Sequence, residues 1–145
     1  EMRRSVSQFW SGPWGAKVRS AKHCYPELPF IYKTRHGILK GQIDLVFQTK
    51  AGDWVILDYK TSRVTKDQIN DASKEYEKQL AFYALIFWKL YGERPAKGVL
   101  YFSSPASAVE FNYSGEDFER FEADLDEAYS TLFLNKMEFS AAAMA

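Results

Sequence analysis

The sequence predicts a single α/β domain spanning residues 1–145, and three observations support this. Helical and strand-like hydrophobic patterns alternate in the order helix, three strands, helix, two strands, helix. A length of 145 residues suits one domain with a sizeable core. Hydrophobic residues make up 46% and aromatic residues 17% of the chain, which supplies that core and excludes a disordered or collagen-like protein.

The first half of the chain is predicted to form a broken helix followed by strands. Residues 3–22 have a helical pattern that Ser11-Gly12-Pro13 interrupts. Alternating apolar residues and one continuous apolar run then indicate β-structure. We expect extended segments at residues 27–33, 38–49 and 54–57, with a hairpin turn at 50–53.

The second half is predicted to contain a long helix, two strands and a last helix. Residues 62–68 are polar and indicate a loop, and apolar steps of three and four predict a helix over 69–91 that Gly92 ends. Strands are expected at 97–103 and 108–113. Ser114 and Asp117 then form a capping box. The last helix has a predicted buried stripe of Phe118, Phe121, Leu125, Tyr129 and Leu132.

Charge is unevenly distributed along a chain whose formal net charge is zero. Residues 1–63 hold 11 basic and 5 acidic residues, while residues 64–145 hold 8 and 14. A basic half suits a polyanionic partner. Chance drift of surface charge explains the same pattern equally well. The zero net charge argues against a protein that holds nucleic acid by charge alone.

The sequence also bears on the compartment. No apolar run is long enough to span a membrane, and residues 80–90, the longest candidate, are interrupted by Lys89. The N-terminal residues lack the apolar stretch of a secretory signal peptide. The single cysteine, Cys24, cannot form an internal disulfide and favours a reducing compartment. We therefore expect a cytoplasmic protein that is not in a membrane.

Three charged residues on neighbouring strands are the candidate reactive groups. Asp58 and Lys60 lie two apart on a strand and so share one face. A plausible register across the 50–53 turn brings Asp44 close to Asp58. Two buried carboxylates repel one another, and Mg²⁺ or Mn²⁺ bound by their oxygens would resolve the cost. Lys60 would then lie beside the attacking water or the phosphate; the alternative is a structural ion pair between Asp58 and Lys60.

Four ordered segments of the chain are similar to a known family. They read Glu27-Leu-Pro-Phe30, Gly41-Gln-Ile-Asp-Leu-Val-Phe47, Val55-Ile-Leu-Asp-Tyr-Lys-Thr61 and Tyr76-Glu-Lys-Gln-Leu-Ala-Phe-Tyr83. Together they resemble the RecB-type nuclease domain of the PD-(D/E)XK phosphodiesterase superfamily, and in particular the nuclease domain of AddA-type helicase–nucleases. The resemblance implies a restriction-endonuclease-like α/β fold, with a mixed central sheet flanked by helices.

The resemblance also implies a role for individual residues. Asp44 and Asp58 match metal ligands, and the backbone carbonyl of Tyr59 would be a further ligand. Lys60 matches the catalytic lysine, and Glu27 matches an acidic residue that helps hold the metal or its water. On the long helix, Gln79 and Tyr83 match a Gln-x-x-x-Tyr signature that supports the active site and the DNA strand, and Tyr76 lies on the same face.

The function implied by the resemblance is a Mg²⁺-dependent (or Mn²⁺-dependent) DNA nuclease. We expect an exonuclease in DNA repair or recombination, with single-stranded DNA at the site. The expected partner is a helicase domain or a helicase subunit. One alternative is a catalytically weak, nuclease-like module for DNA binding or subunit docking. Another, weaker alternative is a junction resolvase or restriction-type endonuclease, which normally lacks the Gln79 and Tyr83 signature.

The chain departs from the family pattern in two respects. Family members usually carry a histidine or glutamate of the metal site on an upstream helix, and His23 and His36 lie too near the predicted strands to fit it. We therefore expect the chain to begin after that helix, as a piece of a larger helicase–nuclease. Some relatives hold an iron–sulfur cluster through four cysteines, which a chain with Cys24 alone cannot do.

Overall fold

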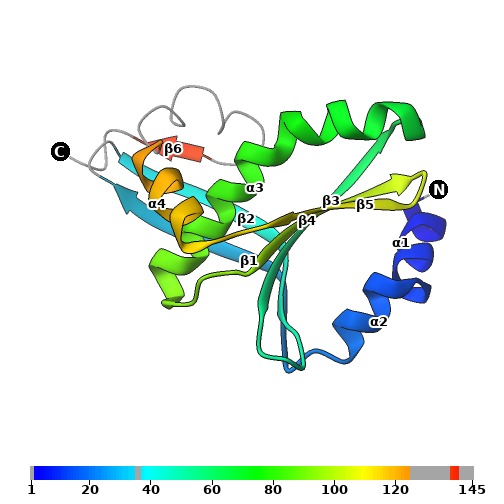
Figure 1. Ribbon diagram of the computed structural model, residues 1–145, viewed down its shortest axis with the longest axis horizontal. Coiled ribbons are helices and arrows are strands. Elements are labelled where there is room, and N and C mark those ends of the chain that lie inside the picture. The colour runs from blue at the N-terminus through cyan, green and yellow to red at the C-terminus, as the bar shows by residue number, and fades with distance from the viewer. Residues whose placement is uncertain (1, 35–36, 125–137, 141–145) are drawn as a thin grey trace.

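A mixed sheet forms the centre of the protein in the computed structural model (Figure 1), which describes residues 2–34, 37–124 and 138–140. Its strands run in the order β1-β2-β3-β4-β5, and β6 pairs with β2 outside this path. The β3–β4 pair is parallel and the other pairs are antiparallel. The strands are β1 (His23–Thr34), β2 (Gly37–Gln48), β3 (Trp54–Arg63), β4 (Lys97–Ser104), β5 (Ser107–Asn112) and β6 (Glu138–Ser140).

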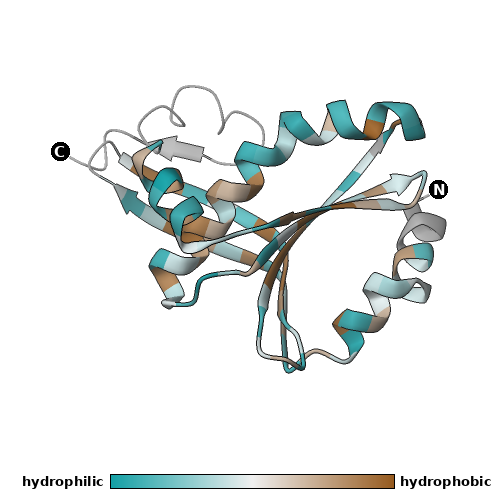
Figure 2. Cartoon of the chain, in the orientation of Figure 1, coloured by the Kyte–Doolittle hydropathy of each residue, from teal (hydrophilic) through white to brown (hydrophobic). Residues whose placement is uncertain are grey.

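Helices cover both faces of the sheet. α1 (Met2–Ser11) and α2 (Pro13–Arg19) pack on one face, while α3 (Ile69–Tyr91) and α4 (Gly115–Ala123) pack on the other (Figure 1). A 3-10 turn, η1 (Lys66–Gln68), precedes α3. Hydrophobic residues are frequent along the central strands (Figure 2). Because strand side chains alternate between the two faces, the strands supply two hydrophobic clusters. Val46, Ile56 and Leu100 pack toward α3, and Phe47, Val55 and Val99 pack toward α1 and α2.

The sheet forks where β2 and β3 separate. These two strands pair only between Leu45↔Leu57 and Gln48↔Trp54. Beyond that segment β2 continues beside β1 and pairs with β6 at Ile38–Lys40, whereas β3 continues beside β4 as far as Arg63. Asp44 and Asp58 are the first residues past the last pair, so the fold places both carboxylates at the fork.

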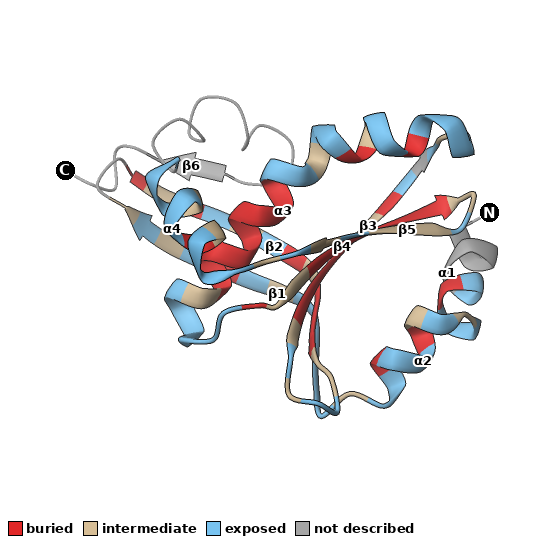
Figure 3. Ribbon diagram, viewed as in Figure 1, coloured by how far each residue is buried: buried red, intermediate tan, exposed pale blue. Residues whose placement is uncertain are grey.

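Helix α3 lies over the sheet at the fork. Residues 79–87 of the helix are buried all round, as Figure 3 shows, while its last turn and much of its first half are exposed. Gly98 on β4 allows the close approach, because a Cβ there would lie 2.8 Å from Leu80 Cδ2 and 2.3 Å from the Tyr113 hydroxyl. Gly92 ends the helix in the left-handed conformation, with φ of 77°.

Most predicted elements are confirmed, including the α/β class, the broken first helix and the helix over 69–91. The loop predicted at 62–68 is wrong in part: β3 runs to Arg63 because β4 still pairs with it there, and η1 follows. The extended segment at 27–33 is part of the longer β1, and β6 was not predicted. Leu125, Tyr129 and Leu132 lie outside the described residues.

Across the parts of the chain that the structure describes, every helix is too short or too polar to cross a membrane.

Candidate active site

At the fork, the side chain of Asp44 on β2 reaches across to β3. Asp44 Oδ2 accepts a hydrogen bond from the Tyr59 backbone N–H at 2.8 Å. This bond joins β2 to β3 just beyond Leu45↔Leu57, their last paired residues. The carboxylate of Asp44 therefore lies beside the chain segment that carries Asp58, as the sequence predicted.

A buried ion pair occupies the β3 side of the fork. Lys60 Nζ lies 2.7 Å from Asp58 Oδ2, and the two side chains are only 8% and 3% exposed. The ammonium also lies 3.8 Å from the centre of the Tyr76 ring and donates a long hydrogen bond of 3.5 Å to Gln79 Oε1. Burying a charge is costly. The carboxylate, the ring and the amide oxygen around this ammonium offset part of that cost, because each favours its charged form.

Tyr83 reaches the same place from α3. Its side chain is fully buried, and its hydroxyl has no hydrogen-bond partner among the described residues. Burial raises the pKa of Tyr83 far above its usual value, and the negative charges of Asp58 and Asp44 raise it further. The hydroxyl thus lies within the field of both carboxylates and has an unused donor. A buried polar group without a partner is uncommon and requires an explanation.

The helical period of α3 explains why Tyr76, Gln79 and Tyr83 meet the strand residues. Spacings of three and four place these side chains on one face of the helix. Tyr59 points to the opposite face of the sheet, where its ring stacks on Tyr101 at 5.5 Å and meets Phe9 edge-on. Only the backbone of Tyr59 is therefore available at the fork, as strand alternation predicted.

Glu27 lies at the edge of this group. The pairs Pro26↔Leu45 and Leu28↔Ile43 place it level with Asp44 across β1 and β2. Its side chain is exposed, whereas Asp58, Lys60 and Gln79 are buried. Its backbone is left-handed, with φ of 51°, which is uncommon for a residue other than glycine. The structure thus brings together the side chains of six predicted site residues and the backbone of Tyr59, and it sets Glu27 on the solvent side.

The oxygen donors at the fork fit a magnesium-type ion better than zinc. Within residues 2–34, 37–124 and 138–140, no three side chains of the His, Cys, Asp and Glu types gather to hold a metal. Two carboxylates do lie near the Tyr83 hydroxyl there, and that of Asp44 accepts a hydrogen bond from the backbone of Tyr59. Mg²⁺ is usually bound by one or two carboxylates and completes its shell with waters and substrate phosphates. The donor set is sufficient for such an ion.

Nearly the whole chain matches a family model. The model of the PD-(D/E)XK nuclease superfamily matches residues 3–144. The chain belongs to that superfamily. The order of strands and helices and the residue pattern at the fork are consistent with this assignment.

Relatives of this nuclease domain carry helicase/nuclease names. The chain is 31% identical over 110 residues to an ATP-dependent helicase/nuclease subunit of Carboxydothermus hydrogenoformans, covering 67% of the chain and 9% of that protein. It is 35% identical over 115 residues to the protein of the same name in Clostridium beijerinckii, covering 66% of the chain and 9% of that protein. The chain therefore spans about a tenth of the length of the curated relatives it matches.

A solved structure supports the fold. The crystal structure of SSO0001 superposes with a TM-score of 0.50 at 17% identity, over 90% of this chain and 59% of that one. At this identity the likeness concerns the fold alone.

Sequence reasoning missed two contacts of the site. The Asp44 carboxylate bonds the Tyr59 N–H, and the Lys60 ammonium lies on the Tyr76 ring. The first depends on the point where two strands separate, which no residue pattern marks. The second could have been found, because Tyr76 shares a helix face with Gln79.

Proposed function

We propose that this nuclease domain is a divalent-metal-dependent enzyme that hydrolyses phosphodiester bonds of DNA. The observation that carries the proposal is the buried Asp58–Lys60 pair, with the Asp44 carboxylate and the unpartnered hydroxyl of Tyr83 beside it. A fold has little structural reason to gather two carboxylates, an ammonium and an unpartnered hydroxyl at a fork in its sheet. A divalent cation would suit the two carboxylates, and a polyanionic substrate would suit the ammonium and the Tyr83 hydroxyl.

The carboxylates of Asp44 and Asp58, with the carbonyl of Tyr59, are the groups that would hold Mg²⁺ or Mn²⁺. When bound, the ion neutralises charge on the phosphate and lowers the pKa of the attacking water. The Tyr59 N–H holds the Asp44 carboxylate in place, and Lys60 holds that of Asp58. Little rearrangement of these two side chains is therefore needed to bind the ion.

The remaining residues position the water and the phosphate. Lys60 orients the attacking water and stabilises the negative charge that develops on the phosphate oxygens. Gln79 and the Tyr76 ring hold the Lys60 ammonium in place. The Tyr83 hydroxyl is free to donate a hydrogen bond to a phosphate oxygen. Glu27, exposed and level with Asp44, helps hold the water.

The names of the relatives support a narrower biological role. Proteins 24–35% identical to parts of this chain are named as subunits of an ATP-dependent helicase/nuclease. We propose that residues 1–145 are the nuclease part of a similar helicase–nuclease. The domain would then act as an exonuclease in DNA repair or recombination, on DNA strands that a helicase module has separated.

Cleavage of a labelled single-stranded oligonucleotide with Mg²⁺ and with EDTA tests the proposal. We expect the unmodified chain to cut only with Mg²⁺, and Asp58→Ala and Lys60→Ala each to lower the rate roughly 100-fold or more. Lys97→Ala is the matched control, because Lys97 forms an exposed ion pair with Glu110 on the neighbouring strands. This control should cut at the unmodified rate.

Metal binding gives a readout that does not depend on turnover. Titration with Mn²⁺, followed by calorimetry, should show one site that Asp44→Asn and Asp58→Asn weaken and Lys97→Ala leaves unchanged. Failure of the folded chain both to bind Mn²⁺ and to cut would overturn the proposal. It would favour the alternative, a module for DNA binding or subunit docking.

A further inference from the structure

Three aromatic rings form a group of their own on the α3 side of the sheet. The centroids of the His23, Tyr25 and Trp54 rings lie 6.1–6.4 Å from one another, and the ring planes are parallel to within 12°. In a column of three stacked rings the outer pair would be about twice as far apart as neighbours. The three rings therefore form a triangle of parallel rings, which we call the aromatic triangle.

The aromatic triangle is anchored on one side and open on the other. Trp54 is half-buried and packs on the buried ring of Phe87, with centroids 5.2 Å apart. Tyr25 is 43% exposed and His23 is exposed. Contiguous exposed apolar surface is a common mark of an interaction site. Ring faces fixed by a scaffold are the form in which proteins stack the bases of single-stranded nucleic acid.

Charge and position also suit a nucleic-acid strand. Two exposed lysines lie near the aromatic triangle: Lys22 directly precedes His23, and Lys50 lies in the adjoining β2–β3 turn. That turn also carries one exposed acidic residue, Asp53. Residues 23–27 of β1 are all exposed and lead from the aromatic triangle to Glu27, which is level with Asp44. At about 3.3 Å per residue, Tyr25 lies roughly 7 Å along β1 from Glu27.

We propose that His23, Tyr25 and Trp54 stack the bases of a single DNA strand whose phosphodiester lies at Asp44 and Asp58. This inference rests on the proposed nuclease function and deepens it, because it explains how the domain prefers unpaired DNA. Bases within a duplex are already stacked on their neighbours, so their faces are not available to these rings. The aromatic triangle would hold the strand a few nucleotides from the site of cleavage.

Equilibrium binding of labelled oligonucleotides in EDTA, followed by fluorescence anisotropy, tests the inference without cleavage. Tyr25→Ala should weaken binding of an oligothymidylate by about 5-fold or more, because stacking one base contributes this much or more to affinity. Tyr25→Phe keeps the ring and should bind as the unmodified chain does. Ile31→Ala is the matched control, since Ile31 is 64% exposed on the same strand. It should leave affinity unchanged.

An oligonucleotide with abasic residues separates stacking from backbone contacts. The unmodified chain should bind it more weakly than the intact strand. Tyr25→Ala should narrow this difference, because one of the three stacking rings is lost. Equal affinity of Tyr25→Ala and the unmodified chain for the intact strand, or no binding by either, would overturn the inference. The cleavage assay with Asp58→Ala is independent of this binding assay. A chain that binds DNA through Tyr25 but never cuts it would refute the proposed nuclease activity and leave the base-stacking inference standing.

Discussion

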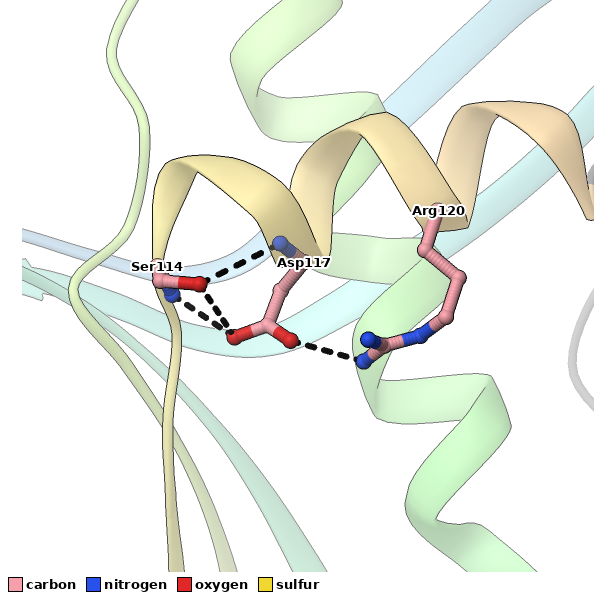
Figure 4. A network of polar contacts seen from close by, with 3 residues as sticks. All are labelled: Ser114, Asp117 and Arg120. Atoms are coloured by element: carbon pink, nitrogen blue, oxygen red, sulfur yellow. Dashed lines mark hydrogen bonds and ion pairs between the residues drawn. The ribbon is translucent and has the colours of Figure 1, made fainter.

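Two clusters of hydroxyl, acidic and basic groups differ in where they lie and in what they leave unpaired. At the start of α4, Ser114 Oγ accepts a hydrogen bond from the Asp117 N–H, and Asp117 Oδ2 accepts one from the Ser114 N–H at 2.7 Å (Figure 4). Arg120 pairs with the other oxygen of Asp117 at 2.7 Å. This capping network comes from one turn of chain, lies at the surface and satisfies the first N–H groups of a helix.

The fork cluster is the opposite in each respect. Asp58 and Lys60 come from β3, Asp44 from β2 and Tyr83 from α3, and the ion pair is almost fully buried. The Tyr83 hydroxyl stays unpartnered within the described part of the chain. Helix formation explains the capping network completely. The fork cluster instead buries an ion pair at the cost of desolvating both charges, which is why we assign it to function.

The largest difference should appear on breaking each ion pair. Lys60→Met removes the ammonium that lies 2.7 Å from the buried Asp58 carboxylate, which should lower the free energy of unfolding by about 3–5 kcal/mol. Arg120→Met removes an arginine whose side chain is 61% exposed and should cost less than about 1 kcal/mol. Urea unfolding in EDTA measures both. Similar losses for the two variants would contradict the comparison, and Asp58→Leu with Lys60→Met should recover most of the first loss.

Tyr59, Tyr83 and Tyr113 each have a buried hydroxyl without a hydrogen-bond partner among the described residues, and the last two sharpen the comparison at a smaller scale. Tyr113, next to the capping network, also has a hydroxyl without a partner among the described residues, and burial raises its pKa. Tyr113→Phe and Tyr83→Phe should each stabilise the protein by about 1 kcal/mol, because an unsatisfied buried hydroxyl is removed. Only Tyr83→Phe should slow DNA cleavage, by about 10-fold. Equal cleavage by the two variants would remove Tyr83 from the site.

The sequence predicts local features of both regions well. The capping box of Ser114 and Asp117 depends on residues three apart, and the helix over Ile69–Tyr91 follows from its own periodicity and from Gly92. Strand alternation correctly separated Tyr59 from Asp58 and Lys60. In each case the physical cause lies within a few residues of chain, so the pattern is visible in the sequence.

Features that depend on distant partners were not predictable. β3 continues through polar residues to Arg63 because β4 supplies hydrogen bonds, and β6 joins β2 from the far end of the chain. The aromatic triangle brings His23 and Tyr25 of β1 to Trp54 of β3 across β2. Spacing of two along β1 indicates that His23 and Tyr25 share a face, but register alone determines that Trp54 joins them.

Removing the hydroxyl of the capping network should cost less than breaking the buried pair. Ser114→Ala loses the acceptor for the Asp117 N–H and should lower the free energy of unfolding by about 1 kcal/mol. Ser20→Ala is a control, since the exposed Ser20 hydroxyl only donates to a carbonyl one turn earlier. Thermal unfolding compares the two. DNA cleavage should be unchanged in both, and a loss of cleavage in Ser114→Ala would mean that the two clusters are coupled.

The smallest effect concerns the charge of Asp117. The hydrogen bond from the Ser114 N–H is the main cause that lowers the pKa of Asp117 below its usual 3.8, with help from Arg120. A carboxyl whose pKa is lower in the folded state adds stability above its unfolded pKa and loses it as pH falls through the folded value. Asp117→Asn should therefore be less stable than the unmodified chain at pH 7, and the gap should close below about pH 4. Urea unfolding at pH 7, 5, 4 and 3 measures the gap, and a gap independent of pH would assign the contribution of Asp117 to hydrogen-bond geometry rather than to charge.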